Sequence, residues 1–426
     1  MQKQGESKVW YSLYGRLLDR RVLYRAFLKV KAAKGAPGND GQTINAFMEK
    51  VSENVIQLEK ELKEKSYRPQ PVRRVEIPKP KGGVRLLGIP AVRDRVVQQA
   101  LLEILTPIYD PHFHPSSYGY RPGRGCHDAI AKASLFMRKY ELKWVVDMDL
   151  SKCFDRLQHD FLIKRLRKRV VDGSILNLIE LFLASGVMVG TTLEETNEGS
   201  PQGGVISPLL ANVYLDYFDQ WTMKRGYRIV RYADDILIFA SSRKGAERRL
   251  RAATDVLENE MGLTVNREKT CITSVKQGVR YLGVVMYSHY TTIQEEKVKA
   301  FKEKAKGLTK RNSGKSLAEI IKSLNPVIRG FANYFRVANC TSLLRSLMSW
   351  IRRRLRAIQL KLWKKPSRLH RRLRQLGYTG DFKKIKMSSW KNARSPLSSL
   401  AIPNKYLYEL GLFDMGSVIT GQTVHC

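Results

Sequence analysis

The sequence of 426 residues predicts an α+β fold, and three observations indicate it. Runs rich in β-branched and aromatic residues alternate with helix-forming segments through the first 290 residues. From Thr291 onward the pattern is almost wholly helical. This second part is also more basic, with 29 Lys and Arg against 7 Asp and Glu in 136 residues. We therefore expect a region of mixed strands and helices, followed by a basic helical region.

The first region alternates helices with short strands. Apolar residues at three-to-four spacing indicate helices over 43–65, 92–105, 126–140, 207–221 and 245–261. In the helix over 207–221, Ser207 is the expected N-cap and Pro208 lies in the first turn. β-prone runs predict a strand over 143–150, a strand or a strand pair over 278–287, a strand–turn–strand over 70–90 and a hairpin over 228–239.

The second region contains a long amphipathic helix over 343–365. Its apolar residues recur at helical spacing, and a cluster of basic residues covers the other faces: Arg352, Arg353, Arg354 and Arg356. A single arginine on such a helix is ordinarily a solvated charge. As a block, these cations are expected to follow the phosphates of a template–primer duplex or a structured RNA, with affinity falling steeply as salt rises.

Composition narrows the class of protein. There are 76 basic and 39 acidic residues, a net charge of +37, while 43% of residues are hydrophobic. A folded, strongly basic chain most often binds nucleic acid; a ribosome-associated protein or a protein of anionic membrane surfaces is the alternative. No signal peptide or membrane-length apolar run is present. Five scattered cysteines without a C-x-x-C pair argue against zinc or disulfides and favour a reducing cytoplasm.

An acid pair, Asp234 and Asp235, interrupts two β-prone runs in "RIVRYADDILIFA". Adjacent carboxylates repel each other, and burying them is costly unless a positive partner offsets the charge. Asp149 ends another β-prone run, and Asp147 and Asp155 are nearby candidates. Carboxylates at a strand end and a neighbouring hairpin suit two Mg²⁺ ions that catalyse phosphoryl transfer. The alternative is an ordinary polar turn and a helix cap.

Two further segments suit nucleotide binding. "EGSPQGGVISPLLANVYLD" (198–216) is a Gly- and Pro-rich loop that leads into a helix, with Gln202 as a hydrogen-bonding side chain. Lys79 and Arg85 flank the Gly82-Gly83 turn and suit a triphosphate clamp. Taken alone, the Gly- and Pro-rich segment is better explained as an ordinary loop, and the basic hairpin as a solvated hairpin tip, which is common.

The ordered motifs resemble those of a reverse transcriptase. They are "RLLGIP", "SYGYRPGRGCHDAI", "VVDMDLSKCFD", "EGSPQGGVISPLLANVYLD", "RYADDILIF", "GLTVNREKT" and "RYLG". "GAPGNDGQT" (35–43), "NPVIRGFANYFR" (325–336) and "IPNKYLYELGL" (402–412) are similar to segments of compact bacterial group II intron-encoded proteins. The resemblance covers about residues 20–415.

The resemblance implies a right-hand polymerase with roles for matching residues. Asp149, Asp234 and Asp235 would bind two Mg²⁺ ions, or Mn²⁺ as a substitute, with the backbone carbonyl of Leu150 as a further ligand. Phe154 would be the steric gate against a ribose 2′-OH. The dNTP would also contact Lys79, Arg85, Gln202 and Lys269, the last near the leaving pyrophosphate. Nucleic-acid contacts would include Arg121, Tyr281, Gly283 and Arg329.

The resemblance also predicts domains and partners. The expected divisions are an N-terminal extension with the start of the fingers (1–70), fingers and palm (71–290), a helical thumb or maturase domain (291–365) and a DNA-binding region (366–426). The expected partners are an RNA template, a DNA or RNA primer, dNTPs, structured group II intron RNA and target DNA, without a membrane. A cytoplasmic, nucleoid-associated location is expected, and a dimer is one possible oligomeric state.

The resemblance does not include an endonuclease domain, and it leaves other functions open. Many intron proteins end in a metal-dependent endonuclease with His and paired Cys, which "TGQTVHC" does not resemble, so no second-strand nicking is expected. The leading function is an RNA-directed DNA polymerase that assists splicing and retrohoming. Alternatives are a non-catalytic splicing cofactor, or a domesticated enzyme of DNA repair, phage defence or CRISPR spacer capture. A viral RNA polymerase is disfavoured by Phe154.

Overall fold

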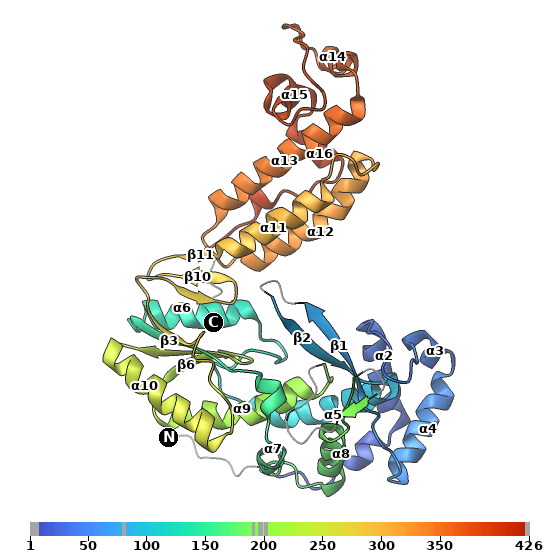
Figure 1. Cartoon of the computed structure of the whole chain (residues 1–426), viewed down its shortest axis with the longest axis vertical. Coiled ribbons are helices and arrows are strands. Elements are labelled where there is room, and N and C mark those ends of the chain that lie inside the picture. Colours follow the sequence, from blue (N-terminus) through green and yellow to red (C-terminus); the bar gives the residue numbers. More distant parts are fainter. Residues whose placement is uncertain (1–7, 79–81, 190–191, 195–198, 200–202, 422–426) are drawn as a thin grey trace. The chain divides into compact units, whose positions relative to one another are not determined.

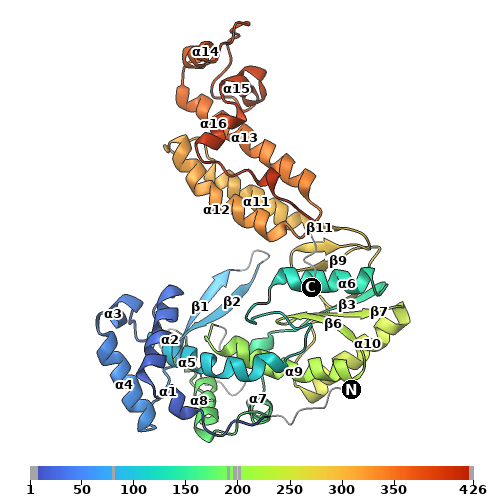
Figure 2. The same cartoon turned by 180° about the vertical axis from the view of Figure 1, so that it is seen from behind.

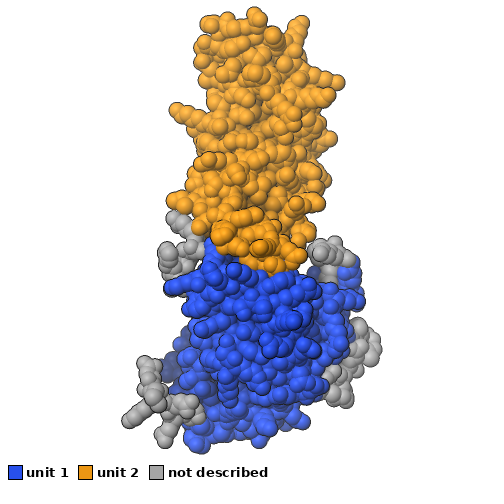
Figure 3. Space-filling model, turned by 90° about the vertical axis from the view of Figure 1, so that its left-hand side faces the viewer, with its two compact units in different colours: residues 1–273 blue, residues 274–426 orange. Residues whose placement is uncertain are grey.

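A computed structural model describes residues 8–78, 82–189, 192–194, 199 and 203–421. The chain forms two compact units, residues 1–273 and 274–426 (Figure 3). Strands and helices alternate in the first unit, and helices dominate the second, so the structure has the α+β fold that the sequence predicts.

The N-terminal part of the first unit joins helices to a small sheet (Figure 1). Its elements are α1 (Tyr14–Leu17), α2 (Arg20–Ala32), α3 (Ile44–Glu49), α4 (Val51–Lys63), β1 (Val72–Pro78), β2 (Val84–Ile89) and α5 (Val92–Tyr109). With β4 (Val187–Val189) and β5 (Thr192–Glu194), the strands form a sheet in the order β2-β1-β4-β5. The helix expected over 43–65 is two helices, because Lys50 leaves the helical region at φ −119° and ψ 34°.

The second sheet carries the acidic motifs. Its order is β6 (Arg228–Tyr232), β7 (Asp235–Ala240), β3 (Trp144–Asp149) and β8 (Cys271–Ser274). Helix α6 (Cys126–Arg138) packs against β6, and α10 (Arg243–Asp255) packs against β3 and β7. Short helices η1 (Asp110–His112), η2 (Cys153–Arg156) and η3 (Val256–Glu260) lie between these elements. Residues 236–240 are all buried, which explains why β7 is apolar after Asp235.

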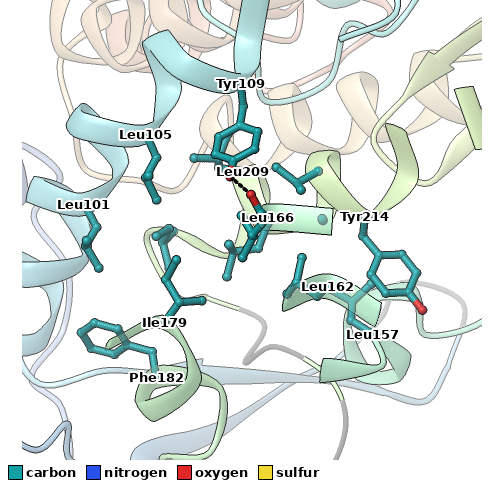
Figure 4. Close-up of a cluster of buried hydrophobic side chains, with 14 of the residues drawn as sticks. Leu101, Leu105, Tyr109, Leu157, Leu162, Leu166, Ile179, Phe182, Leu209 and Tyr214 are labelled. Carbon is teal, nitrogen blue, oxygen red and sulfur yellow. Dashed lines mark hydrogen bonds between the residues drawn. The ribbon is translucent and has the colours of Figure 1, made fainter. Parts of the chain in front are cut away.

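A hydrophobic core joins α5 to α7 (His159–Leu166), α8 (Gly173–Leu183) and α9 (Ser207–Lys224). Figure 4 shows Leu105 of α5, Leu162 of α7, Ile179 of α8 and Leu209 of α9 pointing toward one another. The Tyr109 hydroxyl donates a hydrogen bond of 2.7 Å to the Leu166 carbonyl, which satisfies a polar group inside this core. Helix α9 begins at Ser207 itself, so the N-cap is Ile206 and not Ser207 as expected.

The second unit is a small sheet followed by helices (Figure 2). Strands β9 (Val279–Tyr281), β10 (Val284–Met286) and β11 (Thr291–Ile293) form an antiparallel sheet. The helices are α11 (Glu295–Leu308), α12 (Leu317–Phe335), α13 (Thr341–Trp363), α14 (Pro366–Gln375), α15 (Pro396–Ala401) and α16 (Asn404–Glu409), with η4 (Asn392–Arg394) and η5 (Met415–Ser417). Among the described helices, none is long and apolar enough to cross a membrane.

Candidate active site

Strand pairing brings the predicted carboxylates together. Asp149, the last residue of β3, lies directly opposite Asp235, the first residue of β7. Asp234 stands in the two-residue turn of the β6–β7 hairpin, after Ala233 at φ +59°. Residues opposite each other in an antiparallel pair point to the same face. The register therefore aligns Asp149 with Asp235 and sets Asp234 beside them.

Several carboxylates lie close together at this site, and their negative charges repel one another. Burial, together with the carboxylates of Asp147, Asp234 and Asp149, raises the pKa of Asp235 to about 8. Burial and Asp149 also raise the pKa of Asp234, while Arg85 and Lys269 oppose that shift. Burial and the neighbouring carboxylates thus outweigh the positive charge of Arg85 and Lys269 at Asp234. A divalent cation with oxygen ligands is the chemical group that such a donor set suits.

Asp149 is held by the segment that follows η3. The Nδ2 of Asn266 donates to Asp149 Oδ2 at 3.1 Å, and the Nζ of Lys269 lies 2.9 Å from the same oxygen. The Asn266 backbone N–H also donates to the Asp149 carbonyl at 2.8 Å. Lys269, expected at the pyrophosphate, is thus placed beside Asp149 on a side chain that is 66% exposed.

The backbone of Leu150 is arranged as a potential ligand. Leu150 forms an antiparallel bridge with Val265, but the hydrogen bonds of that bridge belong to the residues on either side of Leu150. Alternate residues of a strand direct their backbone groups to opposite sides. The Leu150 carbonyl therefore points away from Val265, toward the side on which β7 lies.

A buried arginine holds the acidic turn. Arg231 in β6 is fully buried and forms an ion pair with Asp219 of α9, with Nη2 to Oδ2 at 2.6 Å. Its Nη1 donates to the carbonyl of Ala233 at 2.9 Å and to Asn212 Oδ1 at 3.0 Å. Burying this charge is costly unless every donor is used. Arg231 thereby attaches the turn, which contains Asp234, to helix α9.

The loop before α6 also packs on the acidic turn. A methyl group added at Gly119 would lie 2.2 Å from the backbone nitrogen of Ala233, which only glycine permits. The Nδ2 of Asn212 donates to the Gly119 carbonyl at 2.9 Å. The Tyr118 N–H donates to the Arg231 carbonyl at 2.9 Å. Two separate segments of the chain thus constrain one short turn.

The predicted gate residue follows Asp149 in η2. Phe154 is 9% exposed, and its ring meets that of Tyr120 edge-to-face with centroids 6.3 Å apart. Lys152, which precedes η2, has φ +49° and turns the chain sharply after β3. Because of this turn the chain does not continue along the strand, and Phe154 packs against Tyr120.

The structure describes only some of the residues that are predicted to contact the dNTP. Arg85 lies on β2, is exposed, and is close enough to Asp234 to oppose the rise in the pKa of that residue. Lys79 and Gln202 lie outside the described residues. The ends of the Gln202 loop are anchored, because a methyl group at Gly203 would lie 2.3 Å from the Gly88 carbonyl oxygen. At the other end, His159 Nε2 lies 2.7 Å from the Gly199 carbonyl oxygen.

The predicted nucleic-acid contacts differ in their exposure. Arg121 is buried, and its guanidinium donates to Asp110 and to the carbonyls of His114 and Ser117. Arg121 therefore holds this loop together, and its predicted contact with nucleic acid stays a prediction. Tyr281 is also buried, in β9.

The remaining candidates lie in the second unit. Gly283 has φ +83°, and Arg329 is exposed over the ring of Phe413. Three of the arginines on α13 have partners within the unit, since Arg352 donates to Tyr408, Arg354 to Thr309 and Arg356 to Ile402. The structure gives no such bond for Arg353 among its described residues. Most of this block therefore holds the unit together.

Sequence reasoning missed the residues that support the site. Arg231, Asp219, Asn212 and Asn266 carry no chemistry themselves, and their partners are distant in sequence. One signal was available: Asn212 and Asp219 are polar residues two helical turns apart on the otherwise buried face of α9. Such a pair indicates a buried cation, and Arg231 in an apolar strand was the candidate.

Two protein-family models match this chain. Residues 77–286 match the family model of the reverse transcriptase (RNA-dependent DNA polymerase), and residues 298–377 match the group II intron, maturase-specific domain. Protein YkfC of Escherichia coli strain K12 is 34% identical over 318 residues, which cover 63% of this chain and 84% of YkfC. The chain belongs to the group II intron reverse transcriptase and maturase family. By membership of this family, it is an RNA-directed DNA polymerase whose partners are nucleic acids.

Other relatives are longer than this reverse transcriptase. The group II intron-encoded protein LtrA of Lactococcus lactis is 36% identical over 226 residues, covering 52% of this chain and 37% of LtrA. The putative COX1/OXI3 intron 2 protein of Saccharomyces cerevisiae is 29% identical over 62% of this chain and 38% of its own length. The chain thus spans less than half of either protein. A solved telomerase structure from Candida albicans matches with a TM-score of 0.43 and 13% identity, over 82% of this chain and 67% of that one.

Reverse transcriptases generally use divalent metal ions, and the carboxylates of this site are the residues that could hold them. Within the described part of the chain, no three His, Cys, Asp or Glu side chains converge closely enough to hold a metal ion unaided. Mg²⁺ is usually bound by one or two carboxylates together with substrate phosphates and water. The alignment of Asp149 with Asp235, beside the half-buried Asp234, fits that mode of binding.

Proposed function

We propose that this reverse transcriptase copies RNA into cDNA by two-metal nucleotidyl transfer at Asp149, Asp234 and Asp235. The observation that carries the proposal is the β3–β7 register, which sets Asp149 opposite Asp235 with Asp234 in the adjoining turn. The primer 3′-oxygen attacks the α-phosphorus of a dNTP. The bond from that phosphorus to the β-phosphate oxygen breaks, and pyrophosphate leaves. When bound, two Mg²⁺ ions supply activation of the 3′-hydroxyl and neutralisation of the leaving group.

The residues of the chain position these reactants. Asp149, Asp234, Asp235 and the Leu150 carbonyl would hold the cations, and Arg85 with Lys79 would bind the triphosphate. Lys269, whose ammonium lies 2.9 Å from Asp149 Oδ2, would neutralise the pyrophosphate. Its exposed side chain gives it that reach. Gln202 lies near the nascent base pair, and Phe154 excludes a ribose 2′-hydroxyl.

We further propose that the second unit binds structured group II intron RNA and target DNA, and so assists splicing and retrohoming. The match of residues 298–377 to the maturase-specific domain supports this proposal. The excess of basic residues after Thr291 supplies the charge that RNA and DNA phosphates require.

The first experiment is primer extension on an RNA template with dNTPs and Mg²⁺. Wild type is expected to give full-length cDNA and Asp234→Asn none, because the turn carboxylate is lost. Asp381→Asn, an exposed acid of the second unit, is the matched control and is expected to copy normally. Copying by Asp234→Asn would disprove the site. If wild type also fails to copy but binds intron RNA tightly, the chain is a splicing cofactor.

A further inference from the structure

Tyr120 has an unusual backbone and an unusual position. Its φ is +59°, in the left-handed region that non-glycine residues rarely adopt, and its side chain is 53% exposed. Among the described non-glycine residues with positive φ, the others are lysine, glutamate, alanine and leucine, so Tyr120 is the one aromatic residue. Strained backbone of this kind persists where the surroundings enforce it, and often at functional sites.

The residues on both sides of Tyr120 are fixed. Gly119 lies against the backbone of Ala233 and accepts a hydrogen bond from Asn212. Arg121 is buried and donates to Asp110 through two nitrogens, at 2.7 Å each. The phenol is therefore an exposed ring on a rigid loop that packs against the acidic turn.

The ring of Tyr120 lies among three predicted functional groups. It meets Phe154 edge-to-face at 77°, with centroids 6.3 Å apart. Burial raises the pKa of Tyr120, and the Asp234 carboxylate raises it further, while the Arg85 guanidinium opposes that shift. The phenol thus lies near the gate, near an acid of the turn and near the arginine expected at the triphosphate.

We propose that Tyr120 is a specificity-determining residue that backs Phe154 and forms a second wall of the pocket for the sugar of the incoming nucleotide. The proposal rests on the gate assigned to Phe154 above. A lone phenyl ring can rotate away from a 2′-hydroxyl, whereas an edge-to-face partner resists that rotation. Exclusion of ribonucleotides therefore depends on the pair of rings.

The test is single-nucleotide incorporation, comparing kcat/KM for a dNTP with kcat/KM for the matching rNTP. Tyr120→Leu is expected to raise relative rNTP use by about three- to tenfold, the range that one aromatic contact supplies. Tyr120→Phe, which keeps the ring, is expected to retain the wild-type ratio. Tyr120→Asn removes the ring but suits a left-handed backbone, so it should match the Leu variant without strain.

Two controls separate this proposal from the gate itself. Tyr140→Leu removes another half-exposed tyrosine that packs edge-to-face on a phenylalanine, Phe136, and should not change the ratio. Phe154→Ala should raise rNTP use, and adding Tyr120→Leu should then have little further effect. An unchanged ratio in Tyr120→Leu and Tyr120→Asn, or an equal loss of dNTP and rNTP use, would overturn the role of Tyr120. An unchanged ratio in Phe154→Ala would instead overturn the gate.

Discussion

At the scale of single residues, the Arg231–Asp219 pair determines how the acidic turn is presented. Both side chains are fully buried, and the arginine also holds the Ala233 carbonyl. Removing one member of a buried pair leaves the other charged and unsolvated. The pair therefore contributes to stability and, through Ala233, to the position of Asp234.

These two contributions are separable by mutation. Arg231→Met is expected to destabilise the protein by about 3–5 kcal/mol, because Asp219 is left unpaired. Arg231→Met combined with Asp219→Leu is expected to recover most of that loss, since no buried charge remains. The double variant should still have a reduced kcat for incorporation, because the Ala233 carbonyl has lost its donor. Chemical unfolding and incorporation kinetics measure the two effects, and full kcat in the double variant would contradict the positioning role.

A second residue gives a prediction of pH dependence. Burial and the neighbouring Asp219 carboxylate raise the pKa of Asp216 to about 6. Because the ionised form is disfavoured in the folded state, wild type loses stability as pH rises from about 4 to about 6. Asp216→Asn avoids this loss and should be more stable by up to about 3 kcal/mol above pH 6, with no gain near pH 4. Unfolding at both pH values tests this, and a gain that does not vary with pH would refute it.

The acids themselves could be predicted from the sequence, and their supports could not. Asp149, Asp234 and Asp235 stand at the ends of β-prone runs, which is a local pattern. Arg231 and Arg121 look alike in sequence, as basic residues beside aromatic ones. Their buried roles depend on Asp219 and Asp110, which only the tertiary fold brings to them.

At the scale of elements, the acidic hairpin depends on a close approach of the loop before α6. Gly119→Ala would place a methyl group 2.2 Å from the Ala233 nitrogen, so the hairpin or the loop must move. We expect a loss of at least tenfold in kcat, since shifts of about 1 Å can cost a hundredfold in rate. Gly15→Ala in α1 is the matched control, because a methyl group there meets nothing within 4 Å. Wild-type kcat in Gly119→Ala would show that the approach does not matter.

Most elements followed from local patterns, and the exceptions have local causes. The hairpin over 228–239 was predictable because apolar strands flank a short polar turn. The break at Lys50 was not, because both halves of 43–65 have helical periodicity. Strand β11 lies in a region predicted as helical, and its three residues are too few to show a period of two.

At the scale of the whole molecule, charge predicts how binding responds to salt. Among the cations after Thr291, Lys383, Lys384 and Lys386 are exposed and so available to phosphates. Replacing all three with glutamine should make the slope of log affinity for duplex DNA against log salt shallower by about 2–3. Lys50, Lys60 and Lys63, exposed around α4, form the matched control set and should leave the slope unchanged. An equal change in both sets would mean that binding is not localised to the second unit.

The overall charge was readable from the sequence, but its distribution over the surface was not. The block 352–356 is the most basic cluster on α13, yet Arg352, Arg354 and Arg356 are bonded within the second unit. Long basic side chains serve equally as internal donors and as phosphate ligands. Only their partners in the fold distinguish the two uses.

The contact between Gly119 and Ala233 also has a consequence for making variants of this enzyme by recombining related genes. The hydrogen bonds of Asn212 and Arg231 connect three segments, residues 116–121, 207–224 and 228–240. A functional recombinant therefore needs all three segments from the same parent sequence. In a recombined library whose crossovers fall between these segments, the residues that meet at the acidic turn would come from different parents. Most of these variants are expected to be inactive. Crossovers that keep all three segments from one parent would leave the surrounding sequence free to diverge.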